Sequence, residues 1–299
     1  MSDSDSLGVE PSNSLILHEE VIPSVISSLS KNIRAQRYVI HPVIIDGKSL
    51  MVIDGMHRVA ALQNLGIPLT PVYRVDYLGS SNVRLYSWCR VVSHRVGGEY
   101  FREMARELGL CVRRVSQHEA REGLEKRRYA VCIMTHYDGT LALGGEDQGV
   151  WETYQIIAMI DELIRSYGLS YSSEEEAMRK FSSGDAGCIY LVPRLKKEEV
   201  LEIALSGRRL PPKSTRHIVD NRSMFVFAPL ELLKLERSEA ESRLAEWLSG
   251  SRAVKLPPGQ VIDREYEETI VVYLHARDDV LKLYPPQILE LVSRLTSSP

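Results

Sequence analysis

The stretch that decides the fold is residues 52–66, VIDGMHRVAALQNLG. An apolar run ends in Asp54 and Gly55, and after one methionine the pair His57 and Arg58 opens a segment whose apolar residues recur at helical spacing. The segment closes on a glycine, the residue that most often ends a helix. We therefore predict a strand, a tight turn and a helix in this order.

The turn carries residues suited to an anion. The first N–H groups of a helix lack internal partners and bear partial positive charge, and Gly55 would let a ligand approach the backbone. His57 and Arg58 add donors, and the planar guanidinium fits phosphate oxygens. Asp54 would repel a bare phosphate, so it suits a bound cation or a proton to be moved. The alternative is that Asp54 merely caps the helix and Arg58 pairs with a surface acid.

The composition indicates a globular protein. The chain has 299 residues, 44% of them hydrophobic, and a net charge of −3 from 37 basic and 40 acidic residues. This length suggests two lobes and an appendage. Basic residues form no dense cluster, which disfavours general nucleic-acid binding. The four cysteines lie far apart, which indicates reduced thiols and neither a zinc site nor disulfides. The polar N-terminus and the lack of a long apolar run predict a cytoplasmic protein.

Strand and helix patterns alternate along the chain. A helix is expected within residues 15–33, with Pro23 in its first turn. The runs YVIHPVII and SLMVI predict strands of a hairpin closed by Asp46 and Gly47. Further strands and helices alternate to the C-terminus, as in a mixed α/β or α+β protein.

A second polar cluster lies far along the chain, in LPPKSTRH at residues 210–217. It contains three basic groups and two hydroxyls within five residues: Lys213, Ser214, Thr215, Arg216 and His217. Such a loop suits a small anion. The alternative is a solvated turn, because most charged loops are surface loops.

The string Asp-Gly-x-His-Arg-x-x-Ala-x-x-x-Leu-Gly, which begins at Asp54 and follows an Asp-Gly hairpin, resembles the ParB/sulfiredoxin-like superfamily. In that superfamily the turn holds nucleotide phosphates. Sulfiredoxins have a reactive cysteine directly before the His-Arg pair, where this chain has Met56, so sulfiredoxin activity is not expected. ParB proteins continue with a helix-turn-helix and a basic surface, and the sequence shows neither.

Three further motifs resemble the archaeal free L-serine kinases of this superfamily. Their Pro-Lys-[Ser/Thr]-Thr-Arg-His segment is matched at residues 212–217, their His-Glu pair at His18 and Glu19, and their Tyr-x-Trp at Tyr86 and Trp88. The similarity runs in order from about residue 15 to residue 233. It also includes a Gly-Gly segment, in GGEDQG at residues 144–149, before a long helix.

The resemblance implies transfer of a phosphoryl group from ATP or ADP, with Mg²⁺, to the hydroxyl of free L-serine, which would serve cysteine biosynthesis. It implies Glu19 as the base and Asp54 at the phosphates, as a metal ligand or an orienting group. The implied nucleotide contacts are Gly55, Met56, His57 and Arg58, and the implied substrate contacts are Trp88, Lys213, Ser214, Thr215, Arg216 and His217.

The predicted domains are a ParB/sulfiredoxin-like nucleotide-binding domain at residues 15–95, a kinase-specific α/β lobe at 96–233 and a C-terminal α/β extension at 234–299. The extension could pack on the core or form a dimer face, so a monomer and a homodimer both stay open. Family members commonly have a second histidine where this chain has Met56, which could alter the choice of nucleotide. Two other readings stay open: a ParB-like switch that binds CTP and DNA, and a kinase of another small hydroxyl amino acid.

Overall fold

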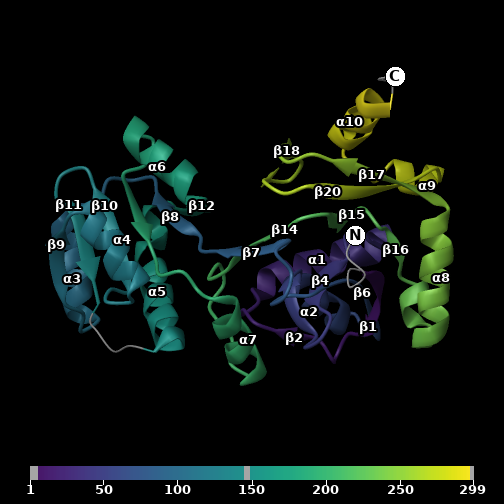
Figure 1. The fold of residues 1–299 in the computed structure, drawn as a ribbon, viewed down its shortest axis with the longest axis horizontal. Coiled ribbons are helices and arrows are strands. Elements are labelled where there is room, and N and C mark those ends of the chain that lie inside the picture. The colour runs from purple at the N-terminus through teal and green to yellow at the C-terminus, as the bar shows by residue number, and fades with distance from the viewer. Residues whose placement is uncertain (1–5, 145–148, 297–299) are drawn as a thin grey trace. The chain divides into compact units, whose positions relative to one another are not determined.

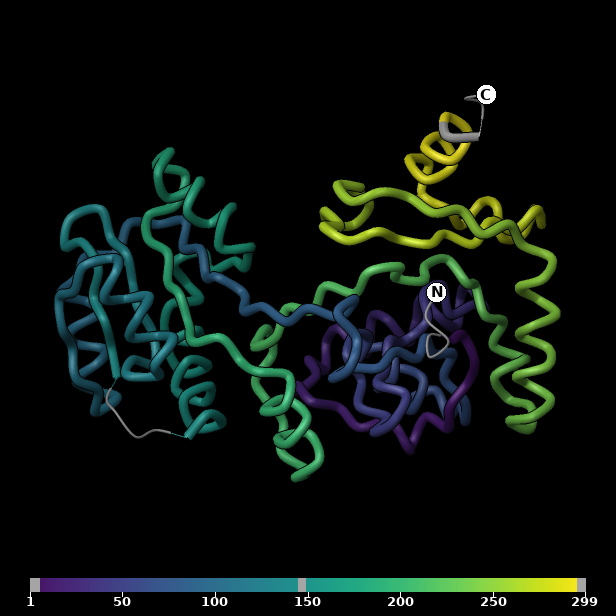
Figure 2. Tube along the Cα trace, in the orientation of Figure 1, coloured from purple at the N-terminus to yellow at the C-terminus, as the bar shows by residue number. Residues whose placement is uncertain are grey.

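The computed structural model describes residues 6–144 and 149–296 (Figure 1). The chain forms two compact units, one made of Met1–Arg84 and His217–Pro299 and the other of Leu85–Arg216. The first unit thus combines the two ends of the chain, which are coloured purple to blue and green to yellow in Figure 2. Within the described residues, no helix is long and apolar enough to cross a membrane.

The first unit is built on a mixed five-stranded sheet. In sheet order its strands are β1 (Ser6–Pro11), β6 (Leu69–Val75), β4 (Val43–Asp46), β5 (Met51–Asp54) and β2 (Ile16–Leu17). The pairs β1–β6 and β4–β5 are antiparallel, whereas β4–β6 and β2–β5 are parallel. The predicted hairpin is therefore confirmed as β4 and β5. Strand β1 was not predicted.

Two helices accompany this sheet. Helix α1 (Pro23–Gln36) begins at the predicted proline, and α2 (Met56–Asn64) begins directly after β5. Helix α2 is followed by Gly66, whose φ of 67° suits the left-handed turn that ends many helices. The predicted strand, turn and helix of residues 52–66 are confirmed.

The C-terminal part of the chain completes the first unit. Its elements are β14 (Arg216–Val219), β15 (Arg222–Met224), β16 (Ala228–Pro229), α8 (Arg237–Ser249), β17 (Ser251–Leu256), β18 (Gln260–Val261), β19 (Glu265–Tyr266), β20 (Ile270–His275), α9 (Asp278–Leu281) and α10 (Pro286–Thr296). Strand β20 pairs with both β15 and β17, while β16 pairs with β3 (Tyr38–Val39). The segment is thus fastened to early parts of the chain through backbone hydrogen bonds.

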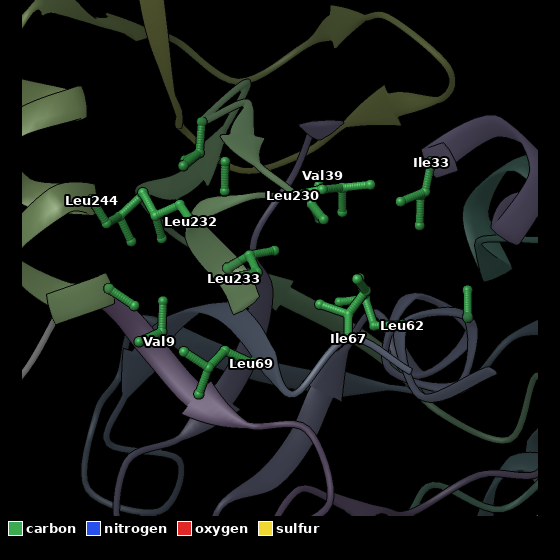
Figure 3. Close-up of a cluster of buried hydrophobic side chains, with 14 residues drawn as sticks. Val9, Ile33, Val39, Leu62, Ile67, Leu69, Leu230, Leu232, Leu233 and Leu244 are labelled. Atoms are coloured by element: carbon green, nitrogen blue, oxygen red, sulfur yellow. The ribbon is translucent and has the colours of Figure 1, made fainter. Parts of the chain in front are cut away.

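One apolar core joins the two ends of the chain. Figure 3 shows Val9 and Leu69 of the sheet facing Leu232, Leu233 and Leu244 of the C-terminal part, and all of these side chains are buried. The segment from residue 234 onward therefore packs on the core of the first unit. This is the first of the two possibilities, packing on the core or forming a dimer face, that the sequence left open. The compact units divide the chain at other positions than the predicted domains do, because these contacts cross the predicted boundaries.

The second unit contains a six-stranded sheet whose neighbouring strands are all antiparallel. In sheet order the strands are β12 (Leu169–Ser172), β8 (Cys89–Val92), β13 (Cys188–Leu191), β10 (Val131–Thr135), β11 (Gly139–Leu143) and β9 (Val112–Val115). Its helices are α3 (Gly98–Glu107), α4 (Gln117–Glu125), α5 (Val150–Ile164), α6 (Glu174–Ser183) and α7 (Lys197–Leu205). The α+β class predicted from the sequence is confirmed. Residues 145–148 of the Gly-Gly segment lie outside the described residues.

Candidate active site

Two neighbouring strands bring the early motifs together. Strands β2 and β5 are parallel, with Ile16 opposite Met51 and Leu17 opposite Val52. Parallel strands end at the same edge of a sheet, so the residues that follow β2 lie beside the end of β5 and the turn after it. Glu19 comes two residues after β2, and this register therefore places it next to the turn that begins at Asp54.

The turn itself has the backbone of an anion site. Gly55 is the N-cap of α2 and has φ 101° and ψ 23°, a conformation that L side chains rarely adopt. Within the described part of the chain no side chain caps α2, so its first N–H groups face the turn. The alternative in which Asp54 caps the helix is wrong, because the carboxylate is engaged elsewhere.

Asp54 is held by two guanidinium groups. Its Oδ2 accepts hydrogen bonds from Arg58 Nη2 at 3.0 Å and from Arg222 Nη1 at 2.9 Å. Burial alone would raise the pKa of Asp54, but the positive charges of Arg222 and Arg58 outweigh it and hold that pKa well below its usual range. Asp54 is therefore an anion at neutral pH. The side chain of Asp54 is 44% exposed, so a ligand can still reach it.

Arg58 lies over the glycine of the turn. A Cβ built on Gly55 would come within 2.6 Å of Arg58 Nη2, and the same nitrogen also donates to Pro42 O at 3.3 Å. The guanidinium of Arg58 is thus fixed across the start of α2 by Asp54 and a backbone carbonyl. An anion at the start of α2 would therefore meet this guanidinium, and the role of Arg58 at the phosphates stays a prediction.

The other two residues of the turn point to different neighbours. His57 Nε2 accepts the backbone N–H of Ile22 at 3.0 Å, which ties α2 to the residue before α1. Met56 is partly buried and packs on the apolar cluster that includes Val52 and Val59. The contacts of the Met56 side chain are thus those of a packing residue, while its backbone belongs to the turn.

The His-Glu pair lies in the bend between β2 and α1, and Glu19 is only 7% exposed. His18 Nδ1 donates to Val52 O at 2.5 Å, and His18 Nε2 is 4.0 Å from Glu19 Oε1. Burial lowers the pKa of His18, against the opposing effect of Glu19, so the ring is neutral. Neighbouring side chains on a helix point in different directions. His18 and Glu19 precede α1, so this restriction does not apply to them.

His217, the last residue of the polar loop, belongs to the same unit. Its ring centroid is 5.4 Å from that of His18, and its Nε2 is hydrogen-bonded to the hydroxyl of buried Tyr77 at 3.0 Å. Three motifs that are far apart in the sequence, at Glu19, Asp54 and His217, therefore meet within the first unit.

The rest of the polar loop belongs to the second unit and is organised around Trp88. The indole Nε1 donates to Thr215 O at 2.8 Å. The cationic groups of Lys213 and Arg216 lie 5.1 Å and 5.4 Å from the centroid of the indole ring. The side chains of Thr215 and Arg216 are buried, so the alternative of a wholly solvated turn is wrong.

Two residues of the second unit differ in their access to ligand. Trp88 is partly exposed and lines a cavity of about 670 Å³ together with Tyr86 and Arg216, so it is a wall residue rather than a core residue. Ser214 is fully buried, and its hydroxyl donates to Pro211 O at 2.7 Å. Ser214 therefore shapes the loop in this structure, and its side chain does not face the cavity.

Whether this part of the molecule could hold a magnesium ion depends on its carboxylates. Among the described residues no group of three or more His, Cys, Asp and Glu side chains could hold a metal ion. Mg²⁺ is commonly bound through one or two carboxylates and the phosphates of a substrate, and partly exposed Asp54 fits that arrangement. The residues thus fit an ion that is held mainly by a nucleotide.

The comparisons with known proteins agree with these motifs. No family model matches the sequence. An ATP-dependent L-serine kinase from Staphylothermus marinus is 27% identical over 226 residues, which are 74% of this chain and 88% of the relative. The ADP-dependent L-serine kinase SerK from Thermococcus kodakarensis is 24% identical over 209 residues, 68% of this chain and 82% of the relative.

The fold gives a second comparison. A solved structure of a free serine kinase in complex with AMP matches with a TM-score of 0.64 and 22% identity, over 76% of this chain and 93% of the other. The sequence relatives confirm the resemblance to the free L-serine kinases, and the solved structure adds the similarity of fold. The chain is related in sequence and in fold to the free L-serine kinases, over most of the length of each relative.

Proposed function

We propose that this protein transfers a phosphoryl group from ATP or ADP to the hydroxyl of free L-serine and releases O-phospho-L-serine. The observation that carries the proposal is the parallel pairing of β2 with β5, which sets Glu19 beside the nucleotide turn at Asp54. Relatives named as ATP-dependent and ADP-dependent L-serine kinases support the reaction class and leave both donors open. A role in cysteine biosynthesis belongs to the same proposal.

Glu19 is the base of the proposed reaction. It takes the proton of the serine hydroxyl while that oxygen forms a bond to phosphorus and the bond to the leaving nucleotide phosphate breaks. Asp54 is a poorer base, because the charges of Arg222 and Arg58 lower its pKa and so weaken its hold on a proton. Neutral His18 lies next to Glu19 and adds no positive charge that would weaken the base.

The nucleotide phosphates lie at the start of α2 in this proposal. The N–H groups of Gly55, Met56 and His57 supply donors without charge, and Arg58 supplies a guanidinium. Asp54 keeps Arg58 in place, and its carboxylate would help to hold Mg²⁺ beside the phosphates. The ion, when bound, neutralises charge on the phosphate oxygens.

The serine is held by the polar loop and Trp88. Lys213 and Arg216 are cations suited to the carboxylate of an amino acid, and Thr215 offers a hydroxyl. His217 is the residue at which this loop joins the first unit, where it lies against His18. We assign Ser214 to the shape of the loop, since its hydroxyl is used by Pro211.

The test is a matrix of nucleotides and acceptors. Purified protein is incubated with ATP, ADP or CTP, with and without Mg²⁺, and with L-serine, L-homoserine or L-threonine, and phosphorylated amino acids are detected directly by mass spectrometry. We expect O-phospho-L-serine with ATP or ADP and Mg²⁺. Phosphorylation of homoserine or threonine in preference to serine would reassign the acceptor, and CTP binding with no phosphorylated product would favour a ParB-like switch.

A further inference from the structure

We propose that Glu268, in the C-terminal segment from residue 234 onward, is a positioning residue of the nucleotide turn. It acts through Arg222 on Asp54 and, through Asp54, on Arg58. None of the sequence motifs includes Glu268 or Arg222. The inference deepens the proposed function and rests on it.

The first link is a buried ion pair. Glu268 lies between β19 and β20 and has no exposed surface. Its Oε1 accepts a hydrogen bond from Arg222 Nε at 2.8 Å and a second from Arg264 Nη2 at 3.2 Å. Because Arg222 also begins β15, which pairs with β20, both the backbone and the side chain of Arg222 are fixed by the C-terminal segment.

The second link leads from this pair to the turn. The guanidinium of Arg222 uses Nε for Glu268 and Nη1 for Asp54, so one planar group joins the two carboxylates. Asp54 Oδ2 also accepts from Arg58 Nη2. The series Glu268, Arg222, Asp54 and Arg58 thus runs without interruption from a fully buried side chain to the residue proposed at the phosphates.

The end of this series is open to a ligand. Asp54, Arg58 and Arg222 line a cavity of about 120 Å³, together with Arg264 and Tyr266 of the C-terminal segment. The C-terminal segment therefore contributes a wall next to the nucleotide turn. A change at Glu268 would reach that turn through two hydrogen bonds.

A purely structural role accounts for this pair less well. Burying two charges costs desolvation, and a buried ion pair often adds no more stability than apolar side chains of the same size. Glu268 Oε2 is moreover buried with no hydrogen-bond partner among the described residues, which adds to the cost. The pair instead fixes the orientation of Arg222, because the rigid guanidinium can face Asp54 in few orientations.

The test compares Glu268→Gln with Glu265→Gln, an exposed residue three positions away. Glutamine can still accept from Arg222 but lacks the charge that orients it. We expect the Kd for ADP or ATP, measured by calorimetry, to rise about tenfold in Glu268→Gln, with the KM for serine within about twofold of the original value. Glu265→Gln should bind nucleotide as the unaltered protein does.

A double-mutant cycle separates positioning from general loosening. If Glu268 acts through Asp54, then Glu268→Gln should weaken nucleotide binding much less in the Asp54→Asn background than in the unaltered protein. Equal factors in both backgrounds, or an unchanged Kd in Glu268→Gln, would overturn the positioning role. If Glu268→Gln shows no cooperative unfolding transition, Arg222→Lys takes its place with the same expectations, because lysine keeps the charge but not the fork.

The direct binding measurement keeps this inference apart from the proposed function. Binding of ADP or ATP by the unaltered protein with no formation of phosphoserine would overturn the reaction and leave the positioning role to be decided by the cycle. Absence of nucleotide binding by the unaltered protein would overturn both.

Discussion

His41 shows how the arginines of the turn act on a neighbouring residue. Its Nδ1 accepts the backbone N–H of Phe225 at 3.1 Å, which requires that nitrogen to be unprotonated. Burial and then the charge of Arg58 lower the pKa of His41 to about 3. Below a pH of about 6.5 the unfolded chain therefore binds a proton that the folded protein does not. The contribution of His41 to stability is complete above that pH and is lost as the pH falls towards 3.

This pH dependence of stability leads to a prediction for His41. In His41→Gln the free energy of unfolding should depend less steeply on pH between about 6.5 and 4 than in the unaltered protein. Part of the slope should remain, since the pKa of buried His18 is lowered as well. Urea unfolding at several pH values measures this, with exposed His118→Gln as the control. An equally steep dependence in His41→Gln would contradict the assignment.

The residues of the site differ in how far the sequence could reveal them. Arg58 and Thr215 lie in short polar motifs whose chemistry is local, so the residues themselves indicated an anion site. Glu19 was indicated only by the resemblance to the serine kinases. Arg222 and Glu268 come together only because β15 pairs with β20, and their spacing in the chain gives no hint of it. Ser214 has the same chemistry as its neighbours in the sequence but faces Pro211.

At the scale of elements, helix α2 offers a matched pair of glycines. Gly55 and Gly66 flank the helix and both have positive φ. A Cβ at Gly55 would also press on Arg58 Nη2 at 2.6 Å, whereas a Cβ at Gly66 would meet nothing within 4 Å. A side chain at either position would strain the backbone, but only one at Gly55 would also disturb the anion site.

We predict that both Gly55→Ala and Gly66→Ala destabilise the protein by about 1–3 kcal/mol, because alanine is strained at positive φ. Only Gly55→Ala should also weaken nucleotide binding, since the added methyl group displaces Arg58. Thermal unfolding and calorimetric titration with ADP measure the two effects. Equal nucleotide affinity in both variants would contradict the placement of the phosphates at the start of α2.

The elements were mostly predictable where their pattern was regular. The β-rich runs of β4 and β5, joined by Asp46 and Gly47, and the helical spacing in α2 gave strong predictions. Strand β1 was missed because Glu10, a charged residue, is buried in it, and the strand becomes recognisable only when Arg74 and Arg237 pair with that carboxylate. Tertiary contacts of this kind override local composition.

At the scale of the whole molecule, the first unit is assembled from both ends of the chain. Sequence order suggested an appendage after residue 233, yet Leu244 shares a core with Val9 and Leu69, and β20 pairs with β15. Such contacts between distant residues leave no periodic pattern in the sequence. The second unit, in contrast, is one continuous segment of the chain.

We predict that a chain ending at residue 235 does not fold stably. It would expose the apolar face that α8 covers and leave Arg222 without its buried partner Glu268. Circular dichroism and thermal unfolding measure this directly. A shortened chain that unfolds cooperatively near the temperature of the full chain would show that the C-terminal segment is dispensable for the first unit.

The central claim is that Glu19, placed beside the nucleotide turn by the pairing of β2 with β5, removes the proton of the serine hydroxyl. Its most direct measurement is the rate of O-phospho-L-serine formation in Glu19→Gln, with the exposed neighbour Glu20→Gln as the matched control. We expect a loss of about 10²-fold to 10⁴-fold in kcat for Glu19→Gln, with nearly unchanged nucleotide affinity and near-normal turnover in Glu20→Gln. Normal turnover in Glu19→Gln would contradict it.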